Sequence, residues 1–165
     1  MRHGHRTQNI IVLGAIRAGI KRFDKIQKIR HIEPEELNSI LEKLENGGLI
    51  LVEEKKGLLG TNVEIMVTKK GSKEIDEQIH EVQTRWNQMS TLYKTRDKEN
   101  LKQFMDENKS FFPMMIFFGV MDMILFSMMF SMMGIAISDY VPSKSMPEGW
   151  DESIGHEEFD MDVES

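Results

Sequence analysis

The sequence contains no cysteine, which excludes disulfides and thiol chemistry without assigning a compartment. It also contains no phosphate-binding glycine loop, zinc-ligand set, nucleophile elbow or pair of catalytic carboxylates in a recognisable spacing. We therefore expect a protein that is not an enzyme and that has neither a cofactor nor a metal site. A signal peptide is not expected either, because the first apolar stretch, residues 10–18, is amphipathic and no small-residue cleavage site follows it.

Charge is distributed unevenly along the 165 residues, although the formal net charge is only −6. Residues 1–31 contain eight Lys and Arg residues and one acidic residue, Asp24, whereas residues 138–165 contain nine acidic residues and one lysine, Lys144. We therefore expect the two ends to engage different partners. The acidic end could engage a protein.

The first half of the chain predicts three short helices and then two strands. Apolar residues 10–16 suit a helix that ends near Gly19, and residues 23–29 suit a second. The third helix begins at Pro34 in the first turn and stops at Gly47, because proline is tolerated at a helix start and glycine favours a helix end. Two β-rich runs, residues 49–54 and 63–68, flank a turn that contains glycine and predict a hairpin.

This order of elements is that of a winged helix-turn-helix, and two motifs resemble a known group. The stretches LEKLENGGLILVEEKKG and VEIMVTKKG are similar to the L-x-x-L-x-x-x-G-L-I and T-x-K-G signatures of MarR- and PadR-type winged-helix regulators, especially small archaeal ones. The resemblance covers roughly residues 8–90. It implies that the third helix faces the major groove of double-stranded DNA and that the hairpin, the wing, faces phosphates.

Basic and polar residues in this region give the expected DNA contacts, since lysine and arginine neutralise phosphates while short polar side chains can read base edges. The candidates are Lys21, Arg22, Lys25, Lys28, Arg30, Asn38, Ser39, Lys43, Lys55 and Lys56. The third helix also carries Glu35, Glu42 and Glu45, which phosphates would repel. A winged-helix module that binds a protein instead of DNA therefore remains the alternative.

After Gly71 the apolar residues follow spacings of four and three, as in a coiled-coil seam. The seam consists of Ile75, Ile79, Val82, Trp86, Met89 and Tyr93. A long helix with this stripe predicts a homodimer, which the resemblance also implies. The alternative is that the stripe packs on the rest of its own chain.

Residues 111–137 form an apolar run with one charged residue, Asp122. A helix from Met114 to Ile137 would extend about 36 Å, enough to cross roughly 30 Å of hydrocarbon. The sequence therefore predicts a transmembrane helix, and lysines before the run predict a single-pass cell-membrane protein with its amino-terminal domain in the cytoplasm. A buried helix of a soluble dimer and a methionine-lined groove for apolar ligands are the two alternatives.

Within the run, small residues would let another helix approach closely and an intramembrane carboxylate would need a partner. The residues concerned are Ser127, Ser131, Gly134 and Asp122. Altogether the sequence predicts a mainly α fold with a small β-hairpin in the winged helix-turn-helix order, a long carboxy-terminal helix and one transmembrane helix. The expected divisions are a winged-helix domain (1–70), a dimerisation helix (71–110), the membrane helix (111–138) and an acidic disordered tail (139–165).

Overall fold

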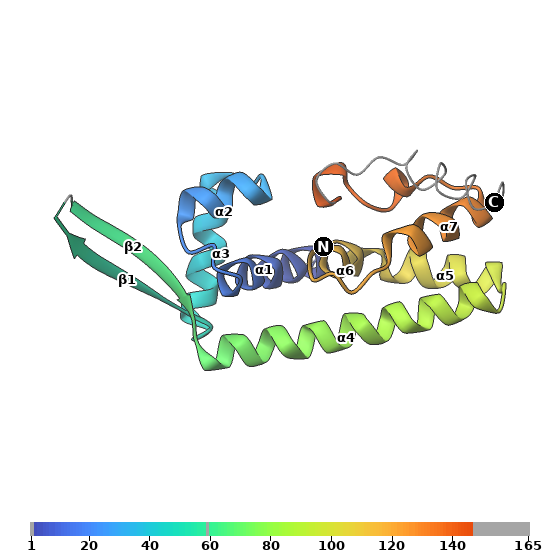
Figure 1. Ribbon diagram of the computed structural model, residues 1–165, viewed down its shortest axis with the longest axis horizontal. Helices are drawn as coiled ribbons and strands as arrows, with labels where there is room; N and C mark the ends of the chain where they lie inside the picture. Colours follow the sequence, from blue (N-terminus) through green and yellow to red (C-terminus); the bar gives the residue numbers. More distant parts are fainter. Residues whose placement is uncertain (1, 59, 147–165) are drawn as a thin grey trace, which may run out of the picture. The chain divides into compact units, whose positions relative to one another are not determined.

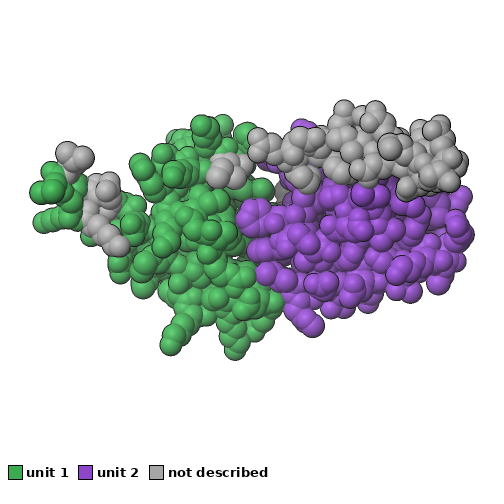
Figure 2. Space-filling view, in the orientation of Figure 1, with its two compact units in different colours: residues 1–78 green, residues 79–165 purple. Residues whose placement is uncertain are grey.

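The computed structural model describes residues 2–58 and 60–146, without the side chains of residues 2–5, 29, 55, 61 and 62. Most of the described chain is helical, with one two-stranded antiparallel sheet (Figure 1). It divides into two compact units, residues 1–78 (unit 1) and 79–165 (unit 2), which Figure 2 colours separately. The division falls inside one long helix, α4 (Lys69–Lys94).

Three helices form the body of unit 1: α1 (Arg2–Arg17), α2 (Phe23–Arg30) and α3 (Pro34–Asn46). Helix α1 packs against both α2 and α3. Helix α3 begins as the sequence predicts, with Pro34 in its first turn, and buries one apolar stripe consisting of Leu37, Ile40, Leu41 and Leu44. Because these residues recur every three or four positions, they share one side of the helix and leave the other side to solvent.

The predicted hairpin is present as β1 (Ile50–Gly57) and β2 (Gly60–Val67) and projects from the helices (Figure 1). Its register pairs Ile50 with Val67 and Val52 with Ile65. Ile50 and Ile65 are buried at the base, where α3 contacts β1 and α1 contacts β2. Val52 and Val63 are 40% and 49% exposed, so only the base of the wing belongs to the core of unit 1.

The two motifs that resemble winged-helix regulators meet in one joint between the end of α3 and the start of α4. The Thr68 hydroxyl donates to the Gly48 carbonyl at 2.7 Å and accepts from the Gly71 amide at 3.0 Å. The Lys70 ammonium donates to the Gly47 carbonyl at 2.9 Å. A Cβ on Gly71 would lie 2.2 Å from the Leu49 carbonyl oxygen, so the joint requires glycine there. The spacing of both motifs thus places their glycines, Thr68 and Lys70 where the hydrogen bonds and the close approach of this joint require them.

Unit 2 contains the rest of α4 and a set of shorter helices. These are α5 (Lys98–Asn108), η1 (Lys109–Phe111), α6 (Phe112–Phe117), α7 (Met123–Met133), η2 (Ile137–Asp139) and η3 (Ser143–Ser145). The Phe126 ring lies at the centre of the core, 5.2 Å from the Phe112 ring, 4.7 Å from the Phe130 ring and 6.4 Å from the Trp86 ring between centroids. Methionines fill much of the remaining core: Met89, Met105, Met114, Met115, Met121 and Met129 are all buried.

The predicted transmembrane helix over residues 111–138 is wrong. Across the described residues, no helix combines the length and the apolar character that a bilayer crossing requires. The apolar run is instead divided between α6 and α7, each too short at about 1.5 Å per residue. Gly119 lies between them with φ +68°, a left-handed conformation that ends α6. The predicted single-pass membrane localisation depended on this helix, so it is wrong as well.

Asp122, predicted as an intramembrane carboxylate, caps the start of α7. Its Oδ1 accepts from the backbone N–H groups of Ile124 at 3.0 Å and Leu125 at 3.1 Å, and the residue is exposed. Such a cap satisfies amide groups that the first turn of a helix leaves without partners. Ser127, Ser131 and Gly134 line a hollow of about 360 Å³ with residues at the end of α7 and after it. The small residues therefore border a cavity in unit 2.

Candidate nucleic-acid interface

Basic residues gather just before α2 and along it. Lys21 precedes the helix and Arg22 occupies its N-cap position without a side-chain cap hydrogen bond. Lys25 and Lys28 follow at a spacing that places them on one side. All four are exposed. Arg22 lies 3.5 Å from the Asp24 carboxylate, whereas Lys21, Lys25 and Lys28 form no ion pair with any residue that the structure describes. We call these three lysines the α2 lysine row.

Arg30 differs from the other basic residues of this helix. It is partly buried at the end of α2, and this burial lowers the pKa of its guanidinium from the ordinary value. Arginine keeps its charge at neutral pH in spite of such a shift. Arg30 is therefore less available to phosphates than the α2 lysine row.

The exposed side of α3 brings together polar and acidic side chains. Asn38, Ser39 and Lys43 are exposed, as DNA contact by this helix requires. Four glutamates, Glu35, Glu36, Glu42 and Glu45, are exposed as well. With Lys43 as its single cation, α3 has a net charge of −3, the difference between one positive and four negative side chains. Its surface can donate and accept hydrogen bonds, but its field repels phosphates.

The wing contributes Lys56, which is exposed near the hairpin tip and pairs in register with Thr61. The backbone of Lys55 pairs with Asn62, but its side chain lies outside the described residues. The wing is tied to the α2 region by a hydrogen bond from the Ile65 amide to the Lys21 carbonyl, 3.2 Å long. The row and the base of the wing are therefore connected through the backbone.

The predicted dimer seam is largely covered by its own chain. Ile75 is buried in unit 1, and Val82, Trp86 and Met89 are buried in unit 2, where the Trp86 ring packs on Phe126 of α7. The remaining two, Ile79 and Tyr93, are partly exposed. Burial inside one chain leaves little of this stripe to contact a second copy. The homodimer itself stays a prediction.

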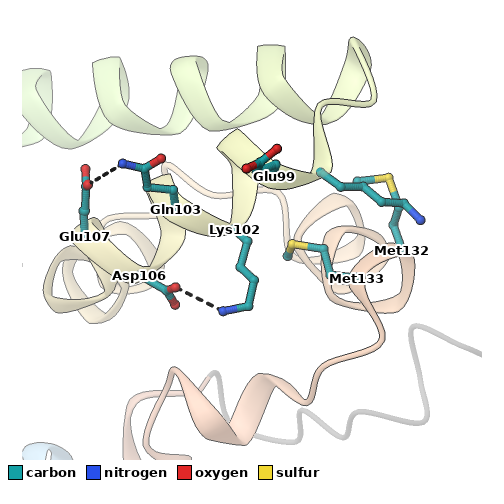
Figure 3. Close-up of a pocket in the computed structure, with 8 residues that line it drawn as sticks. Glu99, Lys102, Gln103, Asp106, Glu107, Met132 and Met133 are labelled. Carbon is teal, nitrogen blue, oxygen red and sulfur yellow. Dashed lines mark hydrogen bonds and ion pairs between the residues drawn. The ribbon is translucent and has the colours of Figure 1, made fainter.

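A second candidate site is a groove of about 670 Å³ in unit 2 (Figure 3). Six residues of α5 and two methionines of α7 line it: Lys98, Glu99, Lys102, Gln103, Asp106, Glu107, Met132 and Met133. Its α5 wall carries two lysines and three carboxylates, and the Lys102 ammonium donates to Asp106 at 3.1 Å. These charges largely cancel, so the groove favours neither an anion nor a cation.

The segment after α7 is held at this groove through Tyr140. Its hydroxyl donates to the Asp106 carboxylate, and its ring lies 5.3 Å from that of Phe130. The hydrogen bond from Tyr140, more than that from Lys102, lowers the pKa of Asp106 and in turn raises the pKa of Tyr140. Val141 is buried, and residues 139–146 of the predicted tail belong to the described chain. The other nineteen, 147–165, lie outside the described residues.

No metal cluster of three or more His, Asp or Glu side chains occurs among the residues that the structure covers. Protein-family models, curated proteins and solved structures give no match to this chain. The α2 lysine row is the site with the clearest chemical preference, because its three exposed lysines form no ion pair with described residues and two of them, Lys25 and Lys28, share one side of a helix. The joint around Gly71 was missed from the sequence, although the T-x-K-G spacing was its signal.

Proposed function

We propose that this chain is a winged-helix DNA-binding protein that regulates transcription, similar to MarR- and PadR-type regulators. The observation that carries the proposal is the α2 lysine row in a unit whose three helices and hairpin follow the element order expected of a winged helix-turn-helix. Cations that form no ion pair with described residues are available for phosphates, and releasing counterions from DNA supplies most of the affinity of such contacts.

In this proposal the row and Lys56 contact the phosphate backbone, and Asn38, Ser39 and Lys43 face the base edges of the major groove. Asparagine pairs well with adenine and lysine with guanine, so these three residues provide direct readout. The glutamates of α3 limit how closely the helix can approach the phosphates. Two of them, Glu42 and Glu45, could instead accept from the amino group of cytosine.

A protein-binding module is the second candidate, and the acidic surface of α3 favours it. A net charge of −3 on an exposed helix suits a basic partner more than a polyanion. The two candidates differ in which helix makes the contact: the row on α2 for DNA, the glutamates on α3 for a basic protein. Substitutions in each helix therefore separate them.

A selection from random duplexes tests the DNA proposal, with the full-length chain immobilised and bound sequences counted. We expect one enriched motif. Asn38→Ala should relax the preference at one position, by about 1–3 kcal/mol, while Lys56→Ala should weaken all duplexes alike. Glu36→Gln, on α3, is the matched control and should leave the motif unchanged. If no duplex is enriched and retention does not depend on salt, the proposal is wrong.

A further inference from the structure

Helix α7 and the segment that follows it border a cavity of about 360 Å³ in unit 2, which we call the α7 cavity. Four of its lining residues recur every three or four positions and so share one side of α7 and its end, and the rest come directly after the helix. They are Ser127, Phe130, Ser131, Gly134, Ile135, Ala136 and Ile137. The first two and the last are buried, whereas Ser131, Gly134 and Ala136 are exposed. The α7 cavity therefore has a buried floor and a rim of small residues.

The Ser127 hydroxyl is the one polar side-chain group of this floor. The residue is only 7% exposed, and its Oγ forms no hydrogen bond with any residue that the structure describes. Hydroxyls on α4 avoid this state, since those of Thr84 and Thr91 each donate to the carbonyl four residues back at 3.0 Å. A buried hydroxyl without a partner costs free energy, and a bound molecule that supplies a partner removes this cost.

The other lining residues determine what kind of molecule fits. No Lys, Arg, His, Asp or Glu occurs among the described residues that line the α7 cavity, so nothing there would offset the charge of a bound ion. Phe130, Ile135 and Ile137 supply apolar surface. An apolar cavity of about 150 Å³ holds benzene, and 360 Å³ is the volume of roughly a dozen water molecules. The α7 cavity is therefore large enough for a small ring with a short substituent.

We propose that the α7 cavity binds a small uncharged molecule with an apolar body and one hydrogen-bond acceptor. The acceptor receives the proton of the Ser127 hydroxyl, and the apolar body contacts Phe130 and Ile137. The short side chains of the rim leave the entrance open. All of these residues belong to unit 2, and the site does not depend on DNA binding, so either proposal can fail without the other.

The first test compares two probes of the same shape, acetophenone and cumene, which has a methyl group in place of the carbonyl oxygen. NMR titration of the full-length chain measures both affinities. In Ser127→Ala the affinity ratio of acetophenone to cumene should fall by about three- to tenfold, because the ketone loses its donor.

The matched control for this test is Ser90→Ala. The Ser90 Oγ is also buried without a partner among the described residues, but Ser90 does not line the α7 cavity. Each substitution removes a hydroxyl that has no partner, so neither should destabilise the fold. The control should keep the original ratio. The same ratio in all three chains, an equal fall in both variants, or no binding of either probe overturns the proposal.

The second test locates the bound probe. Intermolecular nuclear Overhauser effects should connect acetophenone with the methyl groups of Ile135 and Ile137. Ser131→Phe places a ring at the rim and should abolish binding of both probes, whereas Ser143→Phe, at another exposed serine of unit 2, should not. Effects confined to Met132 and Met133 would place the probe in the groove beside α5 and overturn the proposal.

Discussion

The two units bury apolar surface in different ways. Unit 1 uses isoleucine, leucine and valine at regular helical spacing, as in the stripe of α3, and its exposed surface is charged. Unit 2 uses methionine and phenylalanine from an apolar run whose own residues interrupt its helices. Apolar content alone therefore does not decide whether a run of residues forms one long helix or several short ones. In residues 111–137 the fold depends on Gly119 and Asp122, which divide the run.

The largest expected effect is in the aromatic core of unit 2. Phe126→Ala removes a ring that is fully buried against Trp86, Phe112 and Phe130 and should lower the free energy of unfolding of unit 2 by about 3–5 kcal/mol. Hydrogen exchange of peptides from residues 79–146 measures it. Ile124→Ala, on the same helix but 44% exposed, is the control and should cost less than about 1 kcal/mol. Similar losses in both would mean that the α7 core is not packed as described.

The stability of unit 1 should be most sensitive to substitution at the joint between α3 and α4. Gly71→Ala places a methyl group against the Leu49 backbone, which cannot move cheaply, and should destabilise unit 1 by about 3 kcal/mol. Exchange of peptides from residues 8–78 reports it. Gly119→Ala meets no atom within 4 Å, so it should cost only the backbone strain of about 1–2 kcal/mol, and in unit 2. A harmless Gly71→Ala substitution would contradict the close approach.

The cap of α7 gives a smaller effect. Asp122→Ala removes the acceptor for two backbone amides and should destabilise unit 2 by about 1 kcal/mol, whereas Asp122→Asn should retain most of the stability. Urea denaturation of the two variants provides the measurement. Should Asp122→Ala prove as stable as the unsubstituted chain, Asp122 does not act as a cap.

The smallest effect concerns the contact between Tyr140 and Asp106. Tyr140→Phe removes the hydrogen bond that contributes most to the lowered pKa of Asp106, so this pKa should rise towards its ordinary value. A lowered carboxyl pKa stabilises the fold above the unfolded pKa of about 4 and ceases to do so as pH falls through the folded pKa. The stability difference between Tyr140→Phe and the original should therefore shrink in acid. An NMR titration of the Asp106 carboxyl checks it, and an unchanged pKa would refute the contact.

The sequence predicted unit 1 better than unit 2 because its signals are local. Pro34, Gly47 and the alternation in residues 63–67 each determine the structure of their own neighbourhood, and the helices and hairpin follow from them. The apolar run is divided at one glycine, Gly119, and one aspartate, Asp122. These two residues change the average hydrophobicity of the run very little, so the average predicted one continuous helix. Burial of Val82, Trp86 and Met89 was also not predictable, since a stripe has the same spacing whether it packs on its own chain or on a second copy.

The salt dependence of binding measures whether unit 1 binds DNA through the α2 lysine row, as proposed. Affinity of the full-length chain for a duplex is measured at several salt concentrations for Lys25→Ala/Lys28→Ala and for the charge-matched control in unit 2, Lys98→Ala/Lys144→Ala. We expect the slope of log K against log salt to become shallower by about two for the first pair and to stay unchanged for the control. Equal slopes for both pairs, or binding that does not respond to salt, would contradict the proposal.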